Sequence, residues 1–112
     1  MISVSLARGK DGVLASCRAQ GHARFAEKGN DIVCSAVTVL LRTTMQALSE
    51  TEGVIVRADA KARGALDFDV SAENAPSESR CALVYAGRFL EAGIASLARE
   101  YPSNVELKIQ TE

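Results

Sequence analysis

Two amphipathic helical segments, each preceded by a pair of short strand-like segments, constrain the fold of this chain more than any other feature. The first predicted helix spans residues 31–49 and the second spans residues 80–99, and both carry apolar side chains near helical spacing. A chain of 112 residues can build one packed core but has no room for a separate substrate-binding domain. We therefore expect residues 1–112 to form a single domain that carries any active site itself.

The other regular segments have the alternation or the short apolar composition of strands, at residues 1–7, 13–20, 54–59, 65–70 and 105–110. Glycine-containing loops at residues 8–12 and 61–64 predict two hairpins. The resulting element order is ββαββαβ. This order predicts an α+β fold, in which two helices pack on a five-stranded sheet of mixed or antiparallel pairing.

Charge and hydropathy argue against several classes of function. The thirteen basic and fourteen acidic residues are interspersed, so no basic patch predicts direct contact with nucleic acid. The first six residues alternate like a strand and lack the features of an export signal. The longest apolar stretches are shorter than the roughly 18 residues that a membrane-spanning helix needs. We therefore expect a cytoplasmic protein with no membrane partner.

The three cysteines are Cys17, Cys34 and Cys81, and no two of them form a Cys-x-x-Cys pair. An odd number at this spacing is typical of neither a disulfide framework nor a zinc site. We therefore expect reduced thiols, with no metal and no other cofactor. Cys17 falls in a predicted strand and Cys81 falls early in the second predicted helix, where both are interpreted as packing residues.

His22 and Cys34 form the candidate site with the clearest chemistry. His22 is the only histidine, and imidazole is the side chain best suited to move protons at neutral pH. Asp31 predicts the N-cap of the first helix, which would place Cys34 near the N3 position. There the helix dipole and the unpaired amides favour the thiolate and could hold the oxyanion of a tetrahedral intermediate. His22 would accept the thiol proton and return it to a departing amine.

Each of these residues also has a purely structural interpretation. Thr38 follows Cys34 by one helical turn, and it either orients the thiol and imidazole or bonds the backbone carbonyl of Cys34. Asp31 can cap a helix without any catalytic role. Cys34 fits a small packed hydrophobe, and His22 fits a loop residue with no partner. Three arginines are interpreted as solvated surface charges, namely Arg57, Arg63 and Arg80.

The stretch Gly21-His22-Ala23, followed by Gly29-x-Asp31-Ile32-Val33-Cys34-Ser35-Ala36-Val37-Thr38, resembles the ribosomal-processing cysteine protease Prp family. The resemblance implies a catalytic dyad of His22 as general base and acid and Cys34 as nucleophile. It also implies that the substrate is the N-terminal extension of the twenty-seventh protein of the large ribosomal subunit. A homodimer is implied as well, with a flexible loop over the site at residues 23–30 and Gly29 as its hinge.

Three positions depart from that family's pattern. Arg24 stands where a small residue is common, Ser35 replaces a usual alanine, and Thr38 replaces a usual serine. None of these changes removes the nucleophile or its base. Arg24 and Ser35 would lie beside the cleft, so we expect these two residues to affect substrate preference. Gly21 and Ala23 are also expected to belong to the flexible, substrate-binding segment.

Three hypotheses follow for the function of this chain. The first is a cytoplasmic cysteine endopeptidase that acts on the extended tail of a ribosomal protein. The second is a non-catalytic module that binds a ribosomal protein or ribosomal RNA, with the helix N-terminus as an anion-binding point. The third is a thiol redox sensor, which would need a resolving cysteine that the local sequence lacks. The joint placement of His22 and Cys34 favours the enzyme, because anion binding requires neither residue.

Overall fold

The computed structural model describes residues 1–21, 28–59 and 65–112, with the backbone alone at residues 28–31. The elements along the chain are β1 (Ile2–Arg8), β2 (Leu14–Gln20), α1 (Lys28–Ser49), β3 (Ile55–Asp59), β4 (Ala65–Ser71), α2 (Ser77–Glu100) and β5 (Val105–Thr111). This order is ββαββαβ, so the predicted α+β fold is confirmed.

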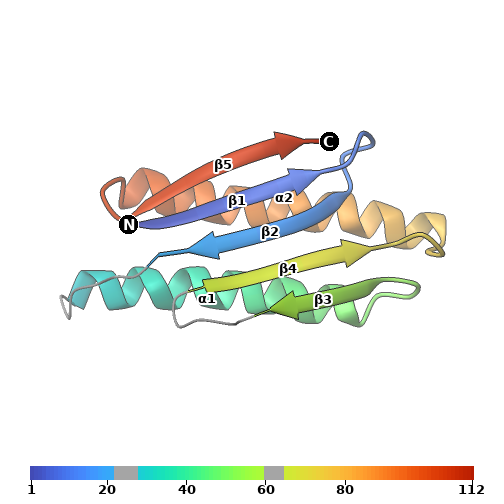
Figure 1. Cartoon of the computed structure of the whole chain (residues 1–112), viewed down its shortest axis with the longest axis horizontal. Helices are drawn as coiled ribbons and strands as arrows, with labels where there is room; N and C mark the ends of the chain where they lie inside the picture. The colour runs from blue at the N-terminus through green and yellow to red at the C-terminus, as the bar shows by residue number, and fades with distance from the viewer. Residues whose placement is uncertain (22–27, 60–64) are drawn as a thin grey trace.

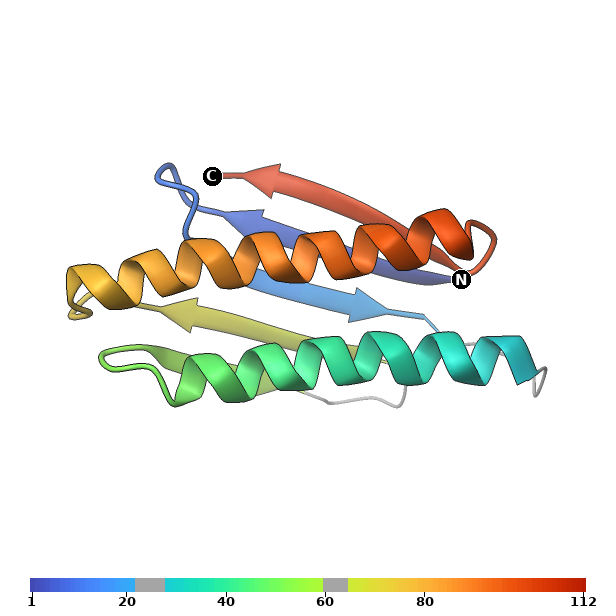
Figure 2. The same cartoon turned by 180° about the vertical axis from the view of Figure 1, so that it is seen from behind.

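The five strands form one sheet in the order β3-β4-β2-β1-β5. The β1–β2, β2–β4 and β3–β4 pairs are antiparallel, whereas β1 and β5 are parallel, so the sheet is mixed. Both helices lie on the same face of the sheet (Figures 1 and 2). Helix α1 covers the β3–β4 side and α2 covers the side of β2, β1 and β5. The fold therefore has two layers, one of helices and one of strands.

The core lies between these layers, because each strand turns alternate side chains toward the helices. Its largest fully buried side chains are Phe68, Leu6, Leu14, Leu41, Leu48, Leu83, Leu90 and Ile94. Each such burial contributes roughly 1.5–3 kcal/mol relative to exposure. The two helices approach closely at Gly93, where a Cβ atom would lie 3.1 Å from Leu40 Cδ1. A larger residue at this position would force the helices apart or displace Leu40.

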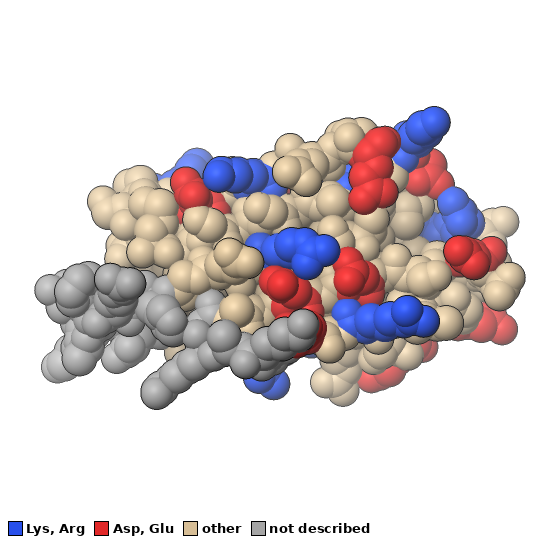
Figure 3. Space-filling view, viewed as in Figure 1, with Lys and Arg blue, Asp and Glu red and all other residues tan. Residues whose placement is uncertain are grey.

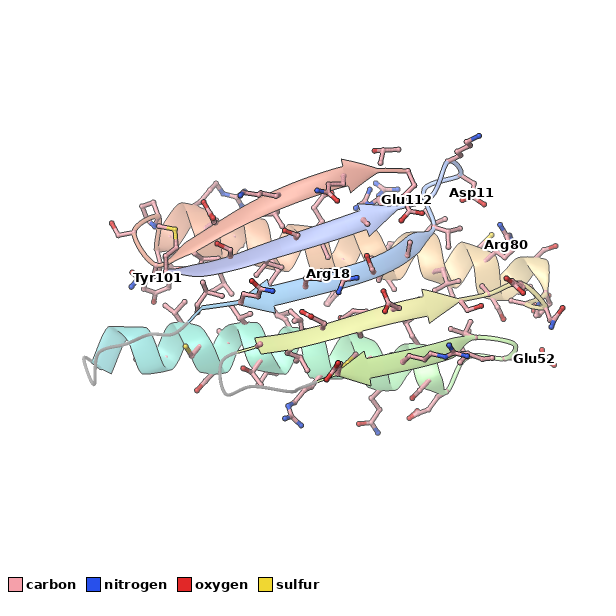
Figure 4. The ribbon with its side chains drawn as sticks, in the orientation of Figure 1. Asp11, Arg18, Glu52, Arg80, Tyr101 and Glu112 are labelled. Carbon is pink, nitrogen blue, oxygen red and sulfur yellow. The ribbon has the colours of Figure 1, made fainter. Side chains whose placement is uncertain are left out.

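The opposite face of the sheet is open and charged, as Figure 3 shows. Arg18 of β2, labelled in Figure 4, contacts two acidic residues of β4, with Nη1 3.5 Å from Asp67 Oδ2 and Nη2 3.6 Å from Asp69 Oδ1. On the same face, between β1 and β5, Ser3 Oγ donates a hydrogen bond of 2.5 Å to Glu106. The alternation of apolar and acidic residues in β4 therefore predicted its orientation correctly, with the carboxylates facing solvent.

Both helices begin earlier than the sequence predicts. Helix α2 begins at Ser77 rather than at residue 80, directly after Pro76, whose φ of −66° suits entry into a helix. Helix α1 begins at Lys28 rather than at residue 31. An acidic residue is favourable both as an N-cap and inside the first turn, so the sequence signal at residue 31 does not distinguish these positions. The predicted N-cap at Asp31 is therefore wrong.

The hydropathy of the helices also differs from the expectation. By length and composition, the windows Ile32–Ser49 of α1 and Ser77–Glu100 of α2 are apolar enough to cross a membrane. The uninterrupted apolar stretches are short, as predicted, but the mean hydropathy of a whole helix is high because single charged residues contribute little to the average. Core helices meet the same criterion, since the face that packs on a sheet is apolar.

Candidate active site

The end of β2, the start of β4 and the N-terminal half of α1 lie at one end of the molecule (Figure 1). The strand register brings two of these elements together, because Gln20 at the end of β2 pairs with Ala65 at the start of β4. We call this region the β2 end. It contains the described part of the His22 and Cys34 motif, since Gly21 directly follows β2 and Cys34 lies in α1.

Gly21 has a structural reason to be glycine. Its φ of +121° is strained for any residue with a side chain. A Cβ atom there would overlap with the carbonyl oxygen of Met1 and would lie 3.1 Å from the Cα of Ile2. The Met1 carbonyl oxygen and the Ile2 Cα are both backbone atoms, so a change of side-chain rotamer cannot move them away. Gly21 therefore sets the path by which the chain leaves β2.

Several predicted site residues fall outside the described part of the chain, namely His22, Ala23 and Arg24. The predicted flexible loop over residues 23–30 is only partly described. Residues 28–30 form the start of α1, and Gly29 is the second residue of this helix. Its assignment as a loop hinge is therefore wrong, because the helix extends one turn farther toward the N-terminus than the polar composition of this segment indicated.

Cys34 is the seventh residue of α1 and is partly buried against the hydrophobic core. It lies in the second turn, so its predicted N3 position is wrong. About 9 Å of helix separates it from Lys28, and the stabilisation of an anion by a helix N-terminus falls off within the first turn. The unpaired first-turn amides therefore belong to residues 28–31, and not to the turn that carries the thiol.

The other two thiols are in different surroundings. Cys17 is 0% exposed, and burial, with a smaller contribution from the Asp67 charge, raises its pKa to about 12. Its interpretation as a packing residue is confirmed. Cys81 is exposed near the start of α2, at the other end of the molecule, so its interpretation as a packing residue is wrong. Cys34 is thus the one thiol of the described chain that lies at the β2 end and is partly accessible.

Two polar neighbours of Cys34 on α1, Thr38 and Ser35, are exposed. Thr38, one turn after Cys34, makes no side-chain hydrogen bond to any residue that the structure describes, so the predicted alternative of a bond to the Cys34 carbonyl is wrong. Thr44 does make such a bond, donating to the Leu40 carbonyl at 2.7 Å. Ser35 is exposed as well. The hydroxyls of Thr38 and Ser35 are therefore accessible to a ligand.

The arginines interpreted as surface charges agree with that interpretation where they are described. Arg57 is exposed on β3. Arg80 is exposed too, and its Nη2 donates to Asp11 Oδ2 at 2.6 Å, which joins α2 to the loop between β1 and β2. The bond from Arg80 is the main cause of a lowered pKa of Asp11. Arg63 lies outside the described residues.

The sequence did not reveal a groove between α1 and β3. It has a volume of about 520 Å³ and is lined by Arg42, Met45, Gln46, Ser49, Glu50, Val56 and Ala58. No short motif marks these residues, because the groove depends on the distance between a helix and a strand. The available sequence signal was the helical spacing in α1. Met45 and Ser49 come 11 and 15 residues after Cys34, which places them on the same face of the helix as Cys34.

The sequence model of the family described as cysteine protease Prp matches residues 1–106. This chain belongs to the cysteine protease Prp family. The family resemblance that the Gly-His and Asp-Ile-Val-Cys motifs indicated is thereby confirmed, and it extends over nearly the whole chain. Among curated proteins, no sequence matches this Prp-family chain.

Several solved structures share its fold, among them the following three. The protein SMU.848 from Streptococcus mutans is 29% identical, with a TM-score of 0.81, and the match covers 100% of this chain and 96% of that one. The essential ribosomal processing protease Prp from S. aureus, in complex with a substrate peptide, is 17% identical with a TM-score of 0.80, covering 98% and 100% of the two chains. The same protease with a covalently linked product peptide is 20% identical with a TM-score of 0.78 and the same coverage.

Proposed function

We propose that this Prp-family chain is a cysteine endopeptidase that removes the N-terminal extension of the twenty-seventh protein of the large ribosomal subunit. Cys34 acts as the nucleophile and His22 as the general base and acid. The observation that carries this proposal is the family match over residues 1–106, combined with the partly accessible Cys34 thiol at the β2 end. Gly21, which directly precedes His22, lies at the same end because it follows the last residue of β2.

The proposed reaction proceeds in two steps. His22 takes the thiol proton of Cys34, whose sulfur attacks the carbonyl carbon of the scissile peptide bond. The tetrahedral intermediate collapses, the C–N bond breaks, and the protonated His22 gives its proton to the departing amine. A water molecule, deprotonated by His22, then attacks the resulting thioester. This second step releases the new carboxyl group and restores the Cys34 thiol.

The position of Cys34 in the second turn of α1 makes His22 more important to this scheme. Because the helix N-terminus is about 9 Å away along the axis, its dipole contributes little to thiolate formation at Cys34. The proton acceptor must then supply most of the activation, and general base catalysis contributes typically 10²–10⁴-fold to a rate. His22, the only histidine of the chain, fits this role.

The S. aureus protease, whose structures contain a substrate peptide or a covalently linked product peptide, supports a peptide substrate for this chain. We propose that Thr38 contacts the thiol or the imidazole, and that Asp31 stabilises the first turn of α1. Gly21, Ala23, Arg24, Gly29 and Ser35 would border the bound peptide. No metal or cofactor is part of the proposed reaction.

We also propose that the protein acts in the cytoplasm as a homodimer. Four large apolar side chains of the helix layer are more than half exposed, namely Ile32 and Val39 of α1 and Tyr85 and Phe89 of α2. Only 28% and 22% of the two apolar helical windows are buried. The helices are thus more apolar than their packing on the sheet requires, and a second copy would cover this surface. Sedimentation of the wild type and of Tyr85→Lys tests the dimer.

The test of the protease uses mass spectrometry of the host's extended ribosomal protein after incubation with wild-type enzyme, Cys34→Ala or His22→Ala. Circular dichroism establishes that each variant is folded. Cleavage by the wild type alone is the expected result. Undiminished cleavage by folded Cys34→Ala would refute the assignment of the nucleophile. Tight binding without cleavage by any of the three proteins would favour the non-catalytic binding module instead.

A further inference from the structure

The groove between α1 and β3 lies on the same side of α1 as Cys34. Successive helical residues are rotated by 100°, so Thr38, Arg42, Met45 and Ser49 all fall within about 80° of Cys34 around the helix axis. Thr38 and Arg42 are exposed and Met45 is partly buried against the core. Among the described residues, a strip of α1 side chains therefore leads from the thiol to the groove.

The floor and the rim of the groove differ in character. Met45 and Val56 are partly buried hydrophobic residues that pack against the core, and they form an apolar floor with Ala58. Arg42 and Gln46 of α1 and Glu50, which directly follows the helix, form a polar rim. Gln46 Nε2 donates to Glu50 Oε2 at 3.4 Å, and both side chains are exposed. Such a groove suits a chain that presents apolar side chains on one face and polar groups on the other.

The wall opposite α1 is β3, which is an edge strand of the sheet. Its partner on one side is β4, with a register that runs from Ile55↔Ser71 to Asp59↔Asp67. The other side of β3 has no strand partner in the described sheet. An edge of this kind can pair with an extended peptide through main-chain hydrogen bonds, while pockets receive alternate side chains.

We propose that the α1–β3 groove binds the substrate segment that lies several residues away from the scissile bond, in an extended conformation along the edge of β3. This inference rests on the proposed protease function. Arg42 lies about 12 Å and Ser49 about 22 Å from Cys34 along the helix axis. At about 3.3 Å per residue, the groove holds the substrate residues roughly four to seven positions from the cleaved bond. Alternate residues of this segment insert apolar side chains over Met45, Val56 and Ala58.

Ala58→Arg tests the proposal, because Ala58 is exposed and an arginine there would fill the groove. The matched control is Ala47→Arg, an exposed alanine of α1 that does not line the groove. The substrates are synthetic peptides across the processing site of the host's extended ribosomal protein. One has about ten residues on each side of the cleaved bond, and two others are shortened to about three residues on one side or the other.

We expect Ala58→Arg to lower kcat/KM for the long peptide at least about tenfold, and Ala47→Arg to leave it unchanged. One of the two shortened peptides lacks the segment that occupies the groove. The wild type and Ala58→Arg should cleave this peptide equally slowly. Arg42→Glu, at another exposed groove position, serves as a second variant in case Ala58→Arg is unfolded by circular dichroism. Wild-type kcat/KM on the long peptide in both folded groove variants would overturn the proposal.

Binding measured in the Cys34→Ala background separates this proposal from the proposed function. Fluorescence anisotropy with the labelled long peptide should show at least about tenfold weaker binding to Cys34→Ala/Ala58→Arg than to Cys34→Ala/Ala47→Arg. Equal affinities for the two double variants would refute the groove even if the wild type is an active protease. A groove-dependent affinity without Cys34-dependent cleavage would retain the groove and refute the protease.

Discussion

The two helices are held in the fold by different kinds of contact. Helix α2 makes two ion pairs to the β1–β2 hairpin, one between Arg8 Nη2 and Glu91 Oε1 at 2.8 Å and one between Arg80 and Asp11 at 2.6 Å. Figure 4 shows Asp11 and Arg80 at the end of the molecule opposite the start of α1. In the described part of α1, the polar side chains make only local bonds within the helix and its C-terminal turn.

This difference indicates how the two helices divide structure and function. The charges of α2 fasten the helix to the hairpin, whereas α1 is held by its apolar face. The polar and reactive groups along one side of α1, from Cys34 to Ser49, remain available to a ligand. We therefore expect substitutions on that side of α1 to change activity at little cost in stability, and substitutions of the α2 ion pairs to do the opposite.

The largest expected effect is the loss of activity in Cys34→Ala. Removal of a covalent nucleophile should lower kcat at least about 10³-fold, because no other thiol lies at the β2 end of the described chain. The free energy of unfolding in urea should change by less than about 2 kcal/mol, since Cys34 is only partly buried. A large loss of stability in Cys34→Ala would show that the thiol is primarily a packing group.

The next largest effect is expected in Gly21→Ala, which should destabilise the protein by about 2–4 kcal/mol. The positive φ and the overlap of a Cβ atom with the Met1 carbonyl both oppose the substitution. Activity should fall as well, because the path of the chain from β2 toward His22 would shift. Thermal unfolding and peptide cleavage measure the two effects. Wild-type stability in Gly21→Ala would show that the start of β1 can move away.

Thiol alkylation compares the three cysteines directly. Iodoacetamide at pH 8 should modify Cys17 at least about a hundredfold more slowly than Cys34, because Cys17 is fully buried and its pKa is raised to about 12. Peptide mapping by mass spectrometry gives the rate for each thiol. Cys81 is exposed and serves as the internal control. Comparable rates for Cys17 and Cys34 in the folded protein would contradict the described packing.

The comparison of the helices is sharpened by Glu91→Ala and Arg42→Ala. Glu91→Ala leaves the partly buried Arg8 without its carboxylate partner, so we expect a loss of about 1–2 kcal/mol in unfolding free energy. Arg42→Ala removes an exposed side chain with no ion pair to a described residue and should cost less than about 0.5 kcal/mol. Equal losses in urea denaturation would remove the distinction between α1 and α2.

The smallest effect concerns the pH dependence of the Asp11–Arg80 pair. In the folded protein, the pKa of the Asp11 carboxyl is lowered from its ordinary value of 3.8, chiefly by the hydrogen bond from Arg80. The pair therefore stabilises the fold above pH 3.8, and this contribution is lost as the pH falls through the lowered pKa. Asp11→Asn should melt slightly below the wild type at pH 6 and at the same temperature under strongly acidic conditions. A difference in melting temperature that grows with acidity would have the wrong sign.

Much of the fold was predictable because the periodicity of the side chains depends on which face each element buries. The acidic residues of β4 alternate with Leu66, Phe68 and Val70, and the structure places these three toward the helices. The start of α1 was not predictable at this level. Polar residues suit a loop and a first helical turn equally well, so the assignments of Asp31, Gly29 and the N3 position of Cys34 followed from one misplaced boundary.

The sequence by itself determined the order of the elements, the family and the candidate nucleophile, because hydrophobic periodicity and short motifs are local properties. Only the tertiary structure decided which thiol is buried, which charges tie α2 to the hairpin, and that α1 and β3 enclose a groove in line with Cys34. These features depend on the distances between residues far apart in the chain. Packing sets such distances, and a local pattern does not contain them.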